Sequence, residues 1–248
     1  LPVEGDSGEF FLRTLEEYSD VLPQVRREFQ KVRPDQYRFV RGLESGDEVD
    51  LNAVVEARSD LRARRTPTDK LYVARQREER DVATLFLLDM SASTDEPADP
   101  RGGSGFARNG RRIIDIAKEA LVLMAAALEE IGDAYAIYGF SGHGRHNVEF
   151  YLVKSFREGL SSAVRGRIGA LEPKRSTRMG AALRHAAEKM ASVPARCRHL
   201  ILISDGFPQD FDYGQDRRSN VYGLRDTTVA LLECEAGGFL PFCITVDR

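Results

Sequence analysis

The chain has 248 residues, of which 42% are hydrophobic and 30% charged, and its formal net charge is −3. This composition indicates a globular protein with a sizeable core, and it excludes an overall electrostatic bias towards nucleic acid or anionic membranes. The sequence contains no run of roughly 18 uncharged apolar residues, and its first residues lack the features of a signal peptide. We therefore expect a cytoplasmic protein that binds neither nucleic acid nor membrane. The chain begins without methionine, which suggests a piece of something longer.

Residues 1–80 are predicted to form a helical N-terminal extension. Apolar residues at alternating four- and three-residue spacing predict an amphipathic helix over 11–32, which Pro23 kinks or divides. The seam of this helix is expected to pack on, or flank, the domain that follows.

A second helix is predicted over about 51–64, with Asp50 at its start, and a short strand near 71–73. Arginines in this helix alternate with acidic residues, and the segment lacks the aromatic residues that stack on bases. We expect a solvated or partner-facing surface there.

Residues 81–248 alternate short apolar runs with segments of helical period. Continuous apolar runs predict strands that are covered on both faces, at 82–88, 134–140, 199–204 and 239–246. Apolar residues three and four apart predict the helices, at 113–131, 160–171, 179–190 and 222–236. A further strand over 147–154 follows a glycine-rich turn and is predicted to return antiparallel. The fold class is therefore α/β, with a doubly wound, mostly parallel sheet that has one antiparallel edge strand.

The three cysteines, Cys197, Cys234 and Cys243, are an odd number and lack C-x-x-C spacing. We interpret them as buried thiols without a redox or metal role. The four histidines do not form a set with zinc-ligand spacing, so a zinc site is not expected.

Polar side chains follow two of the predicted strands. Asp89, Ser91 and Ser93 come directly after the first strand, Asp205 follows the strand over 199–204, and Thr177 precedes a helix. Ligands of open parallel sheets bind beyond the carboxyl ends of the strands, so these five side chains are expected to converge.

Two carboxylates and three hydroxyls are hard oxygen donors that suit Mg²⁺ or Mn²⁺ better than zinc. Because hydroxyls neutralise no charge, a bound ion would stay a strong Lewis acid with an open position for an outside carboxylate. The alternative is that these residues only cap turns and helix starts. Their combination favours the metal site.

An ordered set of three motifs carries a family resemblance. Asp-x-Ser-x-Ser after a strand, a later threonine before a glycine-containing helix, and Ser-Asp-Gly after a further strand resemble the von Willebrand factor A domain with its metal-ion-dependent adhesion site. The resemblance covers about 81–248. It implies that the metal ligands are Asp89, Ser91, Ser93, Thr177 and Asp205.

Longer segments, among them "EPKRSTRMGAALRHA" and "SDGFPQDFDYGQDRRS", resemble the CbbO/NorD family, whose members pair with MoxR-type AAA+ ATPases. The second segment is more similar to the Rubisco-activation branch than to the branch that activates nitric oxide reductase. The resemblance implies a non-catalytic adaptor that grips its client, Rubisco, through Mg²⁺, while a CbbQ-like ATPase supplies the mechanical work. Activation of nitric oxide reductase is the alternative.

An enzyme remains the rival class. A metal-dependent phosphohydrolase of the haloacid dehalogenase type would carry a second acid where this chain has Ser91, which is a poor general acid or base. No P-loop motif occurs, so ATP hydrolysis is not expected, and the glycines within 101–110 are interpreted as a flexible insertion. A vestigial site with a purely structural role is a third reading.

Charged residues after the last site motif are the remaining candidates. These residues can form a charged rim around the metal that helps to select the client, or they can belong to a solvated loop, and the sequence leaves both interpretations open. They are Asp210, Asp212, Asp216, Arg217 and Arg218.

Overall fold

The computed structural model describes residues 1–5, 7–31, 37–77, 81–98, 111–206, 208–210, 212–213 and 221–246. The chain divides into two compact units, one made of Leu1–Lys31 with Asp81–Arg248 and the other of Val32–Arg80. The glycine-rich insertion predicted within 101–110 lies outside the described residues.

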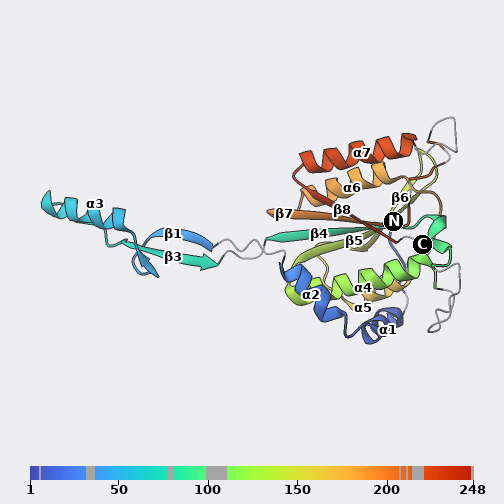
Figure 1. Cartoon of the computed structure of the whole chain (residues 1–248), viewed down its shortest axis with the longest axis horizontal. Helices are drawn as coiled ribbons and strands as arrows, with labels where there is room; N and C mark the ends of the chain where they lie inside the picture. The colour runs from blue at the N-terminus through green and yellow to red at the C-terminus, as the bar shows by residue number, and fades with distance from the viewer. Residues whose placement is uncertain are drawn as a thin grey trace. The chain divides into compact units, whose positions relative to one another are not determined.

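The larger unit is built on a five-stranded sheet in the order β6-β5-β4-β7-β8 (Figure 1). Its strands are β4 (Val82–Asp89), β5 (Ala134–Gly142), β6 (Val148–Lys154), β7 (Cys197–Ser204) and β8 (Leu240–Thr245). All pairs are parallel except β5–β6, so β6 is an antiparallel edge strand. The predicted fold class is confirmed.

Helices cover both faces of this sheet (Figure 1). One face carries α4 (Ile113–Ile131) and α5 (Ser162–Gly169), and the other carries α6 (Met179–Ala191) and α7 (Val221–Ala236). No helix in the described part of the chain is both long and apolar enough to cross a membrane.

The central strand β4 is buried along its whole length, which explains its continuous apolar sequence. Phe86 and Leu88 pack in the core on the α4 face, while Leu85 and Leu87 pack in the core on the α6 face. Successive residues of a strand point to opposite faces, so a strand between two helical layers needs apolar residues at every position.

The helices α1 (Glu9–Glu17) and α2 (Leu22–Lys31) belong to the larger unit and pack on α4 and α5. The helix predicted over 11–32 is divided, and Pro23 lies in the first turn of α2, where its missing N–H breaks no helical hydrogen bond. Phe11 is 1% exposed and joins the α4-face core. The hydroxyl of Tyr18 donates to Glu119 Oε2 of α4 at 2.9 Å.

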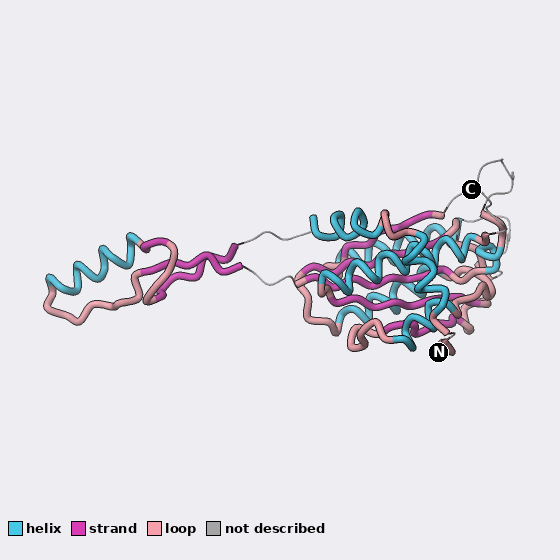
Figure 2. Tube along the Cα trace, turned by 90° about the horizontal axis from the view of Figure 1, so that it is seen from below, coloured by secondary structure: helices cyan, strands magenta, loops and turns pink. Residues whose placement is uncertain are grey.

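The smaller unit holds a three-stranded antiparallel sheet and one helix (Figure 2). Its elements are β1 (Tyr37–Leu43), β2 (Glu48–Val49), α3 (Leu51–Arg62) and β3 (Tyr72–Arg77), and β3 pairs with both other strands. Asp50 caps α3 as expected, because its Oδ1 accepts from Asn52 N at 3.1 Å.

This arrangement differs from the single helical extension expected over 1–80. The first 31 residues pack with the main sheet, whereas residues 32–80 form a separate unit that contains more strand than predicted. The thiol prediction also needs correction: Cys234 is buried, Cys197 is half-buried and Cys243 is exposed. Cys243 is exposed because β8 is an edge strand whose residues are mostly open to solvent.

Candidate metal site

The predicted site residues lie at the carboxyl ends of neighbouring strands. Asp89 is the last residue of β4, and Asp205 directly follows β7. The two strands are parallel neighbours in register, with Leu88 opposite Ile203, so their ends meet at one edge of the sheet. Thr177 comes two residues before α6. The fold thus places these three residues on adjoining connections.

Asp89 is the buried anchor of the site, with 1% of its surface exposed. Its Oδ1 accepts from the backbone N–H of Ser91 at 2.9 Å and from the Thr177 hydroxyl at 3.4 Å. Its Oδ2 accepts from the hydroxyl of Ser204 at 2.8 Å. These contacts hold the carboxylate in one orientation.

No cation among the described residues is recorded as neutralising Asp89, and its electrostatics reflect this. Burial raises the pKa of Asp89 from 3.8 to about 6, the hydrogen bonds from Ser204 and Ser91 oppose that rise, and the negative charge of Asp205 adds to it. A buried carboxylate of raised pKa beside a second carboxylate favours the binding of a cation.

The hydroxyls of Ser91, Ser93 and Thr177 lie on the loops next to Asp89. Ser91 Oγ lies 3.0 Å from Ser93 Oγ, and Thr177 Oγ1 contacts Asp89 directly. Ser91 and Thr177 are buried, whereas Ser93 is exposed and Asp205 is half-exposed. The site is therefore closed by the protein on one side and open to solvent on the other.

Backbone hydrogen bonds tie the loops of the site together. Ala92 N donates to Arg175 O at 2.7 Å, and Thr177 N donates to Gln209 O at 2.9 Å. The loop that holds Thr177 is therefore hydrogen-bonded on one side to the loop that holds Ser91 and on the other side to the loop that follows Asp205. These bonds fix the spacing of the three loops.

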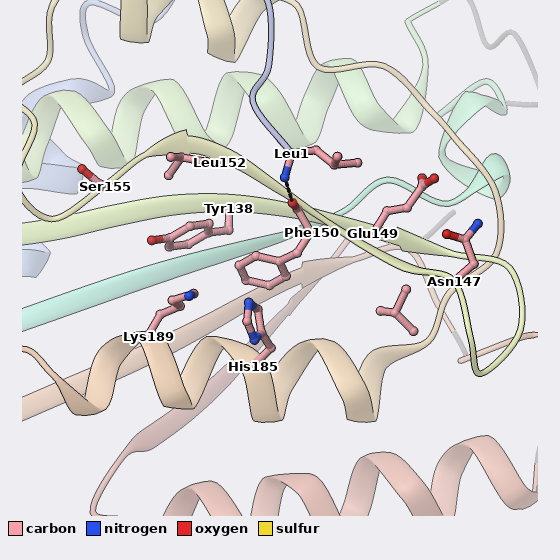
Figure 3. A pocket seen from close by; sticks show the side chains of 10 residues that line it. Leu1, Tyr138, Asn147, Glu149, Phe150, Leu152, Ser155, His185 and Lys189 are labelled. Atoms are coloured by element: carbon pink, nitrogen blue, oxygen red, sulfur yellow. Dashed lines mark hydrogen bonds between the residues drawn. The ribbon is translucent and has the colours of Figure 1, made fainter.

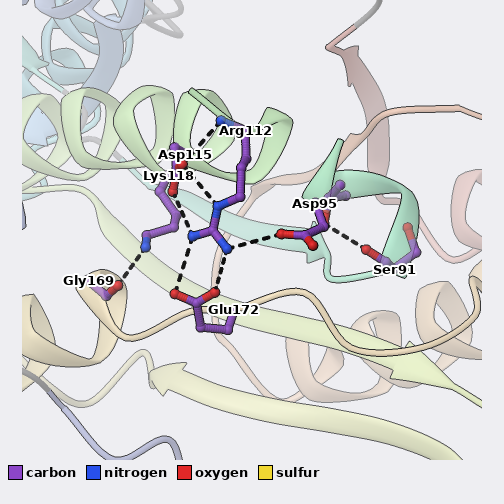
Figure 4. Close-up of polar contacts among 8 residues, drawn as sticks. Ser91, Asp95, Arg112, Asp115, Lys118, Gly169 and Glu172 are labelled. Carbon is purple, nitrogen blue, oxygen red and sulfur yellow. Dashed lines mark hydrogen bonds and ion pairs between the residues drawn. The ribbon is translucent and has the colours of Figure 1, made fainter. Parts of the chain in front are cut away.

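Arg112 joins two of these loops from outside the set of predicted ligands (Figure 4). Its Nη1 donates to Asp95 Oδ1 at 3.1 Å, in the 3-10 helix η1 (Ala92–Asp95), and to Glu172 Oε2 at 2.8 Å. Its Nε donates to Asp115 Oδ2 at 3.2 Å, in the first turn of α4. A planar guanidinium bonded to three carboxylates is a rigid brace between η1, α4 and the loop before Thr177.

Sequence reasoning missed Arg112, and it used Ser204 only as the first residue of the Ser-Asp-Gly motif, without a role of its own. The structure adds that role, because the Ser204 hydroxyl donates to Asp89 Oδ2. Arg112 carries no sequence signal: its partner Glu172 is 60 positions away in the sequence.

Of the five residues predicted to form a charged rim, the structure describes only Asp210 and Asp212, and Asp210 is buried instead of lying on a rim. The side chain of Asp210 is 0% exposed and pairs with Arg178 at 2.8 Å, while both its oxygens accept from Gly144 N. It therefore locks the β5–β6 turn to the start of α6. Asp212 pairs with Arg145 at 2.8 Å on the surface, and this contact lowers the pKa of Asp212. Asp216, Arg217 and Arg218 lie outside the described residues.

The donor set fits a hard divalent cation. The oxygen donors at this edge are two carboxylates and three hydroxyls, and across the described residues no group of three or more His, Cys, Asp or Glu gathers as a metal cluster. Hydroxyl and carboxylate oxygens match Mg²⁺ and Mn²⁺.

Comparison with known proteins identifies the class of this domain. Residues 84–207 match the family model of the von Willebrand factor type A domain. The chain belongs to the von Willebrand factor type A family, as its motifs predicted.

Curated relatives narrow the resemblance. Protein NorD of Stutzerimonas stutzeri is 36% identical over 93% of this chain and 35% of that protein. Protein NorD of Brucella suis is 37% identical over 92% of this chain and 34% of that protein. These relatives confirm the NorD part of the predicted CbbO/NorD resemblance. The chain spans about a third of the length of the curated relatives it matches.

Among solved structures, the PilB minor pilin from Streptococcus sanguinis aligns with a TM-score of 0.50. The match covers 71% of this chain and 60% of that one, at 15% sequence identity. At this identity the likeness shows the fold alone.

Proposed function

We propose that this chain is a non-catalytic, Mg²⁺-dependent adaptor that binds a carboxylate of a client protein. In this proposal Asp89, Ser91, Ser93, Thr177 and Asp205 hold the ion, either directly or through water. The observation that carries the proposal is the buried Asp89 carboxylate, next to hydroxyls and a second carboxylate at an edge that is open to solvent.

Each residue contributes a separate property to this site. Asp89 supplies buried negative charge in an orientation that the Ser91 N–H and the Ser204 hydroxyl hold. Ser91, Ser93 and Thr177 add oxygen donors without adding charge. Asp205, on the half-exposed side, balances the ion while leaving access from solvent. A bound Mg²⁺ would supply the Lewis acid position at which an outside carboxylate docks.

For the client, relatives named NorD support the NorD-like alternative over the Rubisco reading that the sequence segments favoured. We therefore place activation of nitric oxide reductase first, with a MoxR-type AAA+ ATPase as the partner that supplies work. Rubisco, with a CbbQ-like ATPase, is the second candidate. Its support is the segment "SDGFPQDFDYGQDRRS", which begins at Ser204 and is more similar to the Rubisco-activation branch.

The rival enzymatic reading is a metal-dependent hydrolase. The position that would carry a second acid is Ser91, whose hydroxyl lies against Ser93 and whose N–H is bonded to Asp89. A screen with generic phosphoester substrates in Mg²⁺ tests this reading, and we expect no turnover above that of Asp89→Asn.

The adaptor proposal is tested by interferometry with purified nitric oxide reductase and Rubisco on separate sensors. We expect binding to one client in Mg²⁺, its loss in EDTA and its loss in Asp205→Asn, which keeps the shape of the side chain. Glu56→Gln, an exposed change on the smaller unit, is the matched control and should bind as the wild type does. Client binding that survives both EDTA and Asp205→Asn would overturn the metal mechanism.

A further inference from the structure

A cavity of about 690 Å³ lies between the edge strand β6 and helix α6 (Figure 3). Its walls include Tyr138, Asn147, Phe150, Leu152, His185 and Lys189, and none of the proposed metal ligands lines it. Leu1 closes one side, where its amine donates to Phe150 O at 2.7 Å. The volume is within the range of about 300–1,000 Å³ that is typical of small-ligand pockets.

Rings form the floor and one wall of this cavity. Tyr138 and Phe150 pack with their ring centroids 4.8 Å apart, and Phe150 meets His185 edge-to-face at 4.6 Å. Leu152 extends the apolar surface along β6 (Figure 3). An apolar or aromatic body would lose water against these side chains, which favours its binding.

The hydroxyl of Tyr138 is a hydrogen-bond donor at the wall of the cavity (Figure 3). Tyr138 as a whole is 8% exposed, but its hydroxyl is not among the buried side-chain atoms of the described residues that lack a hydrogen-bond partner. The ring is therefore buried while the hydroxyl oxygen stays accessible. A ligand oxygen in the cavity can accept a hydrogen bond from this hydroxyl.

Charge indicates which kind of oxygen the ligand should carry. Lys189 lies at the same end of the cavity as Tyr138, and no ion pair to another described residue is recorded for its exposed amine (Figure 3). Glu149 lies towards the opposite end, and its Oε2 accepts from the Tyr151 hydroxyl. His185 has Glu188 of its own helix 3.4 Å away, so it is not counted as a free positive charge.

We propose that this cavity is a second binding site, which takes a carboxylate carried on an apolar or aromatic body. The carboxylate accepts hydrogen bonds from the Tyr138 hydroxyl and the Lys189 ammonium, and the body lies on Phe150 and Leu152. The carboxylate can come from a small organic acid or from an acidic residue of a protein segment. The site is independent of the metal.

The test is an NMR titration of the ¹⁵N-labelled chain in EDTA with three probes. N-acetylphenylalanine carries the carboxylate, N-acetylphenylalaninamide is its neutral match, and a peptide with blocked ends carries Glu beside Phe. We expect the acid to shift the amides of 147–152 and 185–189 and the amide probe to bind at least about tenfold more weakly. Tighter binding of the peptide than of the acid indicates a protein ligand, and the reverse order indicates a small acid.

Three variants decide whether the named donors carry the binding. Lys189→Met and Tyr138→Phe should each weaken binding of the acid by about tenfold, whereas Lys70→Met, exposed on the smaller unit, should not. Tyr138→Phe keeps the ring and removes only a hydroxyl that lines the cavity, so its unfolding midpoint without ligand should stay close to that of the wild type. Equal binding of acid and amide, shifts outside the cavity, or unchanged affinity in Lys189→Met would overturn the proposal.

Discussion

Replacing Asp89 by asparagine removes a buried negative charge while keeping the shape of the side chain. The pKa of Asp89 is raised from 3.8 to about 6, mainly by burial, so ionised Asp89 destabilises the metal-free fold. At 1.36 kcal/mol per pKa unit, this corresponds to about 3 kcal/mol above pH 6. Asparagine can still accept from Ser91 N and pair with the Ser204 hydroxyl, which can rotate. We expect Asp89→Asn in EDTA at pH 8 to be about 3 kcal/mol more stable than the wild type.

The pH dependence of this difference isolates Asp89 from other groups. The folded state holds its proton to higher pH than the unfolded state, so the wild type gains stability as the pH falls from about 6 towards 4. The gap to Asp89→Asn should therefore close over that range. Urea unfolding followed by circular dichroism measures it, since the chain has no tryptophan, and Asp69→Asn on the exposed surface is the control. A gap that is absent at pH 8, or that does not change with pH, would refute the reasoning.

Three further substitutions test the brace, the buried ion pair and the N-terminal helices. Arg112→Met should weaken Mg²⁺ binding in calorimetry by about tenfold to a hundredfold, and unchanged affinity would exclude a positioning role for the brace. Asp210→Asn removes the nearer of the two carboxylates that pair with Arg178, leaving Asp212 at 3.6 Å, and should cost about 2 kcal/mol in urea unfolding; a loss below about 1 kcal/mol would contradict the lock. Phe11→Ala should cost about 3–5 kcal/mol, whereas Leu12→Ala, at a neighbouring position that is 54% exposed, should cost far less; equal losses would show that α1 is not part of the core.

Much of the larger unit follows from sequence pattern because burial on both faces leaves a clear mark. The run over 82–88 is apolar at every position, since its side chains enter two cores, and the structure places β4 there. Asp89 and Asp205 could be paired in advance because parallel neighbours end at the same edge.

The remaining features depend on contacts that local pattern does not report. The run over 37–43 contains arginine, glycine and exposed Phe39, so it lacks the alternation of a half-buried strand, and β1 is defined by its pairing with β3. Asp210 looks like a surface residue in the sequence, yet Arg178 and Gly144 N, from distant segments, make its burial possible.

The central claim is that the polar edge formed by Asp89 and its neighbours holds a hard divalent cation. Anomalous diffraction from crystals of this chain grown with Mn²⁺ tests it most directly, because Mn²⁺ shares the oxygen preference of Mg²⁺ and scatters anomalously. The account predicts one ion next to the hydroxyls of Ser91, Ser93 and Thr177, with a remaining position held by water or by an outside carboxylate. Absence of Mn²⁺ at this edge, with Asp89 still bonded to Ser91 N and Ser204, would contradict it.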